Sequence, residues 1–171
     1  MGGGTAFYDA IYLGSAEIMK GQSGRKALIM LTDGEDNASR VSIQQAITTT
    51  QRADTLAYSI RISDDSAFIP FAPPGMGRPR GWGHVGRMPH TDGKQVLQEI
   101  SRKTGGSYFE VSNKLSVEQI YDRIEEELRN QYSIGYTSDE PESTVYRKIH
   151  LTTKRKGLTI QAREGYYASN T

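Results

Sequence analysis

The feature that most constrains the fold is an apolar run over residues 26–32 that leads directly into an acidic turn at 33–37. A short apolar run bounded by turn residues is typical of a strand buried on both faces, as in a parallel sheet covered by helices. The sequence therefore predicts an α/β domain with this strand inside its sheet.

The rest of the chain alternates between helical and strand patterns. Helices are predicted over 6–20, 42–53, 93–104 and 117–130, and strands over 55–62, 107–111, 132–137, 145–153 and 158–163. The inner face of the first helix is predicted to comprise Phe7, Ile11, Ile18 and Met19. We expect a doubly wound, mostly parallel sheet with helices on both faces, followed by a C-terminal antiparallel β-hairpin.

Two units and one long loop are predicted. Residues 1–137 are expected to form the α/β domain, and residues 138–171 the hairpin extension packed on it. The segment 69–90 is rich in proline and glycine, which is typical of a solvated surface loop. As a partner-binding loop it would use Trp82 as an anchor, with Arg78 and Arg80 as polar contacts.

Composition narrows the classes of function. Twenty-one basic and 20 acidic residues give a net charge of +1, which provides no electrostatic case for nucleic acid as the main partner. There are no cysteines, so disulfides and thiolate metal sites are excluded. No apolar run approaches the roughly 20 residues of a membrane span.

The candidate site combines a hydroxyl and a carboxylate. Thr5 follows a glycine run at the start of the first helix, and Asp33 follows the 26–32 strand. Both positions lie at the edge of an open α/β sheet where ligands bind, and such oxygen ligands suit Mg²⁺. The expected rim of the site is formed by Gly4, Gly34, Glu35 and Asp36. The simpler alternative is that Thr5 is only a helix N-cap and Asp33 only a turn residue.

Four segments of the chain resemble the von Willebrand factor A (VWA) domain, and in particular the bacterial VWFA-related proteins typical of acidobacteria. They are Gly-Gly-Thr-Ala-Phe-Tyr-Asp-Ala-Ile at 3–11, Leu-Ile-Met-Leu-Thr-Asp-Gly-Glu-Asp-Asn at 28–37, and the C-terminal runs around 128–136 and 157–167. The resemblance implies a metal-ion-dependent adhesion site, in which Thr5 and Asp33 match two of the metal-ligating positions. It also implies an exported protein, periplasmic or extracellular.

The family's first motif, Asp-x-Ser-x-Ser, is absent, because the only Asp-x-Ser here (Asp64-Asp65-Ser66) follows the wrong strand. We therefore expect a truncated domain that holds Mg²⁺ or Mn²⁺ weakly or not at all. Without the first strand, the 26–32 strand would have an open apolar edge. We expect this edge to pair with a second chain, to exchange an element with one, or to be covered by the C-terminal hairpin.

The predicted function is a protein-binding or adhesion module, not an enzyme, whose metal would take an acidic side chain from the partner. The alternative is a Mg²⁺-dependent hydrolase or transferase using Asp33, Glu35 and Asp36. No general base, nucleophile elbow or phosphate-binding loop accompanies those carboxylates in the sequence.

Overall fold

The computed structural model describes residues 4–62, 92–136 and 146–167. Its elements are α1 (Phe7–Leu13), the π-helix η1 (Gly14–Met19), β1 (Lys26–Thr32), α2 (Ile43–Arg52), β2 (Thr55–Arg61), α3 (Gly93–Thr104), β3 (Tyr108–Glu110), α4 (Val117–Arg129), β4 (Tyr146–Lys148) and β5 (Gly165–Tyr167). The predicted loop 69–90, with Arg78, Arg80 and Trp82, lies outside the described residues. Its role stays a prediction.

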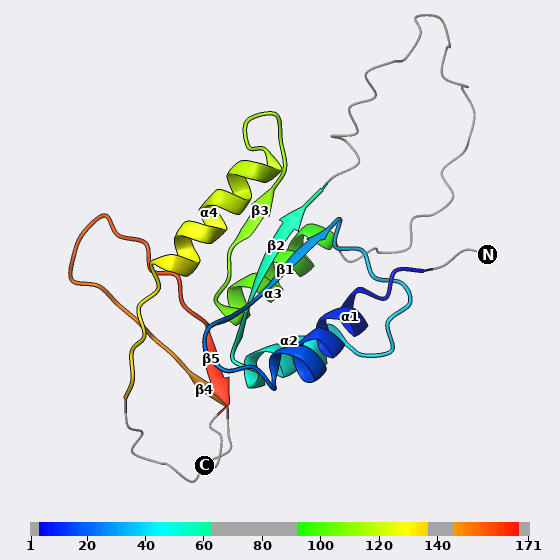
Figure 1. The fold of residues 1–171 in the computed structure, drawn as a ribbon, viewed down its shortest axis with the longest axis horizontal. Coiled ribbons are helices and arrows are strands. Elements are labelled where there is room, and N and C mark those ends of the chain that lie inside the picture. The colour runs from blue at the N-terminus through cyan, green and yellow to red at the C-terminus, as the bar shows by residue number, and fades with distance from the viewer. Residues whose placement is uncertain (1–3, 63–91, 137–145, 168–171) are drawn as a thin grey trace, which may run out of the picture.

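The central sheet is parallel and has the order β1-β2-β3 (Figure 1). β1 and β2 pair without interruption from Lys26 opposite Thr55 to Thr32 opposite Arg61. β3 pairs with the second half of β2. Parallel neighbours require a crossover, and α2 provides it between β1 and β2. The α/β class expected from the sequence is confirmed.

Helices cover both faces of this sheet. On one face, α1, α2 and α3 pack against the sheet around Met30 of β1 and Ala57 of β2. On the other face, α4 packs against Tyr58 and Ile60 of β2. Alternate residues of β2 thus enter two separate cores, which is why β2 is buried along most of its length.

Local sequence signals fix where the helices begin. Ser42 and Gln45 form a complete capping box at the start of α2, and Ser116 and Gln119 form another at the start of α4. The Asp92 side chain accepts a hydrogen bond from the amide of Lys94 and starts α3. These three predicted helices are confirmed to within two residues.

Two predictions about burial are wrong. In the first helix, Phe7 and Ile11 are buried as predicted, but the geometry becomes π-helical at Gly14 and the second half of the predicted inner face is not buried. Ser15, four residues after Ile11, is buried against α2, while Ile18 is 61% exposed. β1 is not buried on both faces, because α4 lies over β2 and leaves Ile29 38% and Leu31 48% exposed.

The C-terminal strands also differ from the prediction. Residues 132–136 and 158–163 form no strand, and β4 pairs antiparallel with β5, placing Tyr146 opposite Tyr167. The two strands form a sheet of their own and do not join β1, so the expectation that the hairpin covers the β1 edge is wrong.

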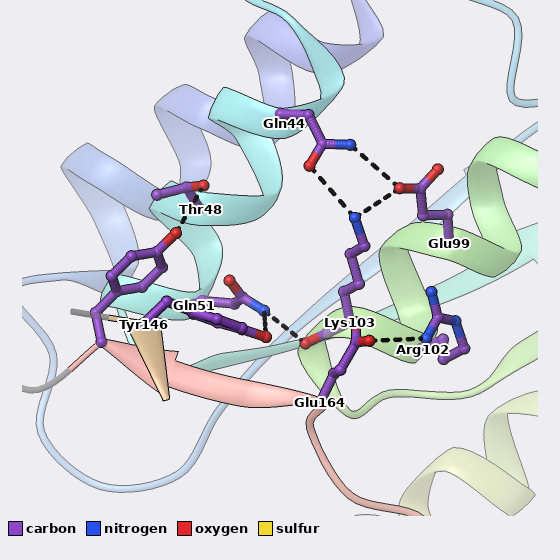
Figure 2. Close-up of polar contacts among 9 residues, drawn as sticks. Gln44, Thr48, Gln51, Glu99, Arg102, Lys103, Tyr146 and Glu164 are labelled. Carbon is purple, nitrogen blue, oxygen red and sulfur yellow. Dashed lines mark hydrogen bonds and ion pairs between the residues drawn. The ribbon is translucent and has the colours of Figure 1, made fainter. Parts of the chain in front are cut away.

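The hairpin instead docks on α2 and α3 (Figure 2). Gln51 of α2 bridges the carbonyl of Lys103 (2.8 Å) and the hydroxyl of Tyr146 (3.3 Å). Arg102 of α3 forms an ion pair with Glu164 at 3.3 Å. Arg52 stacks over the Tyr167 ring, 4.7 Å from its centroid. These contacts hold the hairpin at the end of the sheet opposite the candidate site, where β2 begins.

Candidate functional site

The candidate site lies where the parallel strands end. The last residues of β1, β2 and β3 are Thr32, Arg61 and Glu110, which the strand register places side by side. Residues 33–41, called here the acidic loop, leave this edge after β1 and run past the start of α1 and of α3. This is the edge at which open α/β sheets bind ligands.

Thr5 meets the acidic loop through its backbone. Its amide donates to Asn37 Oδ1 at 2.7 Å, and its carbonyl accepts from the amides of Asn37 (3.1 Å) and Ala38 (3.2 Å). Gly4 lies so close that a Cβ atom there would come within 2.4 Å of Asn37 Oδ1. The structure therefore brings Gly4 and the Thr5 backbone to the loop that begins with Asp33.

The simpler interpretation of Thr5 as the N-cap of the first helix is wrong. The N-cap position is Ala6, which provides no side-chain hydrogen bond. The cap comes instead from the acidic loop, because Asp36 Oδ1 accepts from the amides of Phe7 (2.7 Å) and Tyr8 (3.3 Å). A carboxylate at a helix N-terminus also interacts favourably with the helix dipole.

Asp9 of α1 forms further hydrogen bonds with the acidic loop. Its carboxylate accepts from the amides of Val41 (2.9 Å) and Arg40 (2.9 Å), and its own amide donates to Ser39 Oγ (3.0 Å). The hydrogen bonds from the Val41 and Arg40 amides hold the pKa of Asp9 below its usual value. The loop and the helix are thus joined by hydrogen bonds in both directions.

Asp33 and Glu35 are the exposed carboxylates of the loop. Asp33 Oδ1 accepts from the Glu35 amide at 3.0 Å, which forms a local turn, and the Gly34 amide donates to Thr32 Oγ1 at 3.1 Å. The turn interpretation of Asp33 is therefore correct. A turn of this kind does not prevent the carboxylate from meeting a ligand, because the side chain is exposed to solvent.

The contact that anchors the start of the loop was not predicted from the sequence. Gly34 has φ +86°, and a Cβ atom there would lie 2.4 Å from the Gly93 carbonyl oxygen. A Cβ atom on Gly93 would likewise lie 2.5 Å from the Asp33 carbonyl oxygen. The two backbones touch without side chains between them, so both positions require glycine. The only signal in the sequence was a glycine at the first position of a predicted helix.

An ion-pair group beside the acidic loop was also missed. Glu110 pairs with Lys94 of α3 at 2.9 Å and with Arg61 of β2 at 2.7 Å. The hydrogen bond from Lys94 lowers the pKa of Glu110, and the same bond raises the pKa of Lys94. This part of the edge therefore has its charges paired, while the exposed carboxylates lie on the acidic loop.

The donor atoms fit a hydrated divalent cation only in part. The exposed Thr5 and Asp33 offer a hydroxyl and a carboxylate, whereas Asp36 Oδ1 is engaged by the amides of α1. Within residues 4–62, 92–136 and 146–167, no group of three or more His, Asp or Glu side chains is placed to hold a metal ion. A cation at this edge would keep most of its water ligands.

Comparison with family models, with curated proteins and with solved structures finds no match to this chain. The VWA resemblance therefore stays a prediction from the sequence motifs. In the part of the chain that the structure describes, no helix is long and apolar enough to cross a membrane.

Proposed function

We propose that this chain is a protein-binding module of the VWA type, with a doubly wound α/β fold, and that its partner docks at the carboxyl edge of the sheet. The observation that carries the proposal is the acidic loop. It presents Asp33 and Glu35 to solvent while its backbone is held by Thr5, by the first turn of α1 and by Gly93 of α3.

A loop held in this way suits recognition. Binding does not have to order the loop, so less free energy is lost on association than with a mobile segment. Thr5 and Asp33 are the residues that would hold a Mg²⁺ or Mn²⁺ ion, which, when bound, would offer an open coordination position to an acidic side chain of the partner. The exposed Gly4 and Glu35 would form the surrounding surface, whereas Gly34, expected on this rim, is buried against Gly93.

The enzyme alternative requires Asp33, Glu35 and Asp36 to act together. Asp36 Oδ1 already accepts hydrogen bonds from the amides of Phe7 and Tyr8 and from the Ser39 hydroxyl. Its engagement as a helix cap favours the binding hypothesis over a three-carboxylate hydrolase or transferase.

The test is calorimetric titration of Mg²⁺ and of Mn²⁺ into the 171-residue chain and its Asp33→Ala variant. We expect weak saturable binding by the wild type that is lost in Asp33→Ala. The matched control is Asp122→Ala, which removes an exposed carboxylate on α4 and should bind like the wild type. Absence of binding by the wild type, or equal binding by Asp33→Ala, would contradict a metal-dependent site.

A further inference from the structure

β1 is an edge strand of the central sheet, and one of its two sides has no neighbouring strand among the described residues. In the described part of the chain it pairs only with β2, and that pairing is continuous over all of Lys26–Thr32. The strand contains no bulge or proline to protect this edge, and its one charged residue, Lys26, lies at its first position. The opposite edge strand, β3, is protected by its length of only three residues.

The side chains around this open edge are apolar and exposed. Ile29 and Leu31 project on the sheet face that α4 covers only over β2, with 38% and 48% of their surfaces exposed. On the other face, Gly14 of η1 lies against Leu28, and Ile18, about one turn further along η1, is 61% exposed. An unpaired strand edge flanked by exposed apolar side chains is typical of an interaction surface.

The hairpin is not the occupant of this edge. It is held against α2 and α3 by Gln51, which donates hydrogen bonds to the Lys103 carbonyl and the Tyr146 hydroxyl, as Figure 2 shows. Any strand that pairs with this edge therefore comes from a segment other than β4 and β5.

β1 is complementary to itself when two copies run antiparallel. A two-fold axis through Ile29 places Ile29 opposite its copy, Leu31 opposite Ala27, and Lys26 opposite Thr32. The exposed apolar side chains of both copies then share one face of the joined sheet. The basic start of each strand lies beside the acidic end of the other, where Asp33 and Glu35 follow.

A parallel pairing lacks this complementarity. It would place Lys26 beside its own copy and the acidic loop beside the acidic loop, and like charges at neighbouring positions are destabilising. It would also turn the Ile29 and Leu31 side chains of the two copies to opposite faces of the joined sheet.

We propose that two copies of this chain pair through β1, antiparallel and with Ile29 on the two-fold axis. The two three-stranded sheets then form one continuous sheet. The acidic loops lie at opposite ends of the β1 pair, so the dimer would present two copies of the candidate site. This inference does not depend on what binds there.

The register can be tested by cross-linking, because the native chain contains no cysteine. Ile29→Cys places two thiols opposite each other across the axis, at the roughly 4.5–5.5 Å Cα separation of antiparallel neighbours, which a disulfide can span. We expect a disulfide-linked dimer under mild oxidation. Tyr121→Cys, at an exposed position on α4, should remain monomeric under the same denaturing, non-reducing conditions.

The assembly itself is tested by light scattering coupled to size-exclusion chromatography. We expect the mass of a dimer for the wild type and of a monomer for Leu31→Lys, with unchanged far-ultraviolet circular dichroism because Leu31 is half-exposed. Tyr121→Lys should stay dimeric. A monomeric wild type, a Leu31→Lys variant that remains dimeric, or an Ile29→Cys variant that does not cross-link would overturn the proposal.

Discussion

β1 and β2 are neighbouring strands of equal length, yet they are held in different ways. From Ala57 to Ile60, β2 is buried on both faces, between α3 on one side and α4 on the other. β1 has one face half-exposed and one edge open, and it is anchored at its carboxyl end, where the acidic loop joins α1 and α3. An edge strand of a sheet can therefore be positioned by the loop that follows it as much as by its contacts with the core.

The strongest test of this comparison removes side chains from the two strands. Ile60→Ala creates a cavity in a fully buried site and should lower the free energy of unfolding by about 3 kcal/mol. Leu31→Ala should cost less than about 1 kcal/mol in dilute protein, because half of that side chain is already exposed. Urea denaturation of both variants measures the difference. Equal losses would show that β1 is buried as deeply as β2.

The next largest effect concerns the anchor of the acidic loop. Gly34→Ala should lower the free energy of unfolding by about 2–3 kcal/mol, because it adds a Cβ clash with the Gly93 carbonyl to an unfavourable positive φ. The matched control is Gly24→Ala, with φ +87° and open space around it, which should cost about 1 kcal/mol for the φ angle alone. Thermal or urea denaturation compares the two. Equal costs would mean that the contact between Gly34 and Gly93 does not hold the loop.

The smallest effect is a dependence on pH. The pKa of Asp9 is lowered by the amides of Val41 and Arg40, so its contribution to stability is present above its unfolded-state pKa of about 3.9. That contribution is lost as the pH falls through the lowered folded-state pKa. The stability difference between the wild type and Asp9→Asn should therefore shrink below about pH 4. Denaturation curves from pH 7 to pH 2.5 would show this, and a constant difference would contradict the role of Asp9 in joining α1 to the loop.

Local signals predicted most of the regular structure. The bounds of β1 and α3 match the predicted segments, and the capping boxes of α2 and α4 form as expected. Such signals act between residues that are close in the chain, so they are present in the sequence itself. The described residues 132–136 and 158–163 do not form the strands expected there, because β-propensity does not determine which strand, if any, lies alongside.

The candidate site was predictable only in outline. Thr5 and Asp33 were expected at the same edge of the sheet, and the structure brings Thr5 to the loop that Asp33 begins. The capping of α1 by Asp36 joins residues 29 positions apart, and the contact between Gly34 and Gly93 crosses a still longer separation. No local pattern encodes such contacts.

The sequence by itself determined the α/β class, the order of the helices and strands that form the main domain, and the acidic turn at the end of β1. These depend on periodicity, on caps and on turn residues, which are properties of neighbouring positions. Only the tertiary structure decided that apolar β1 would be half-exposed while β2 is buried, and that Asp36 would cap α1 in place of Thr5. Burial and long-range hydrogen bonds depend on which elements lie beside a residue in space, and that is settled only when the whole chain packs.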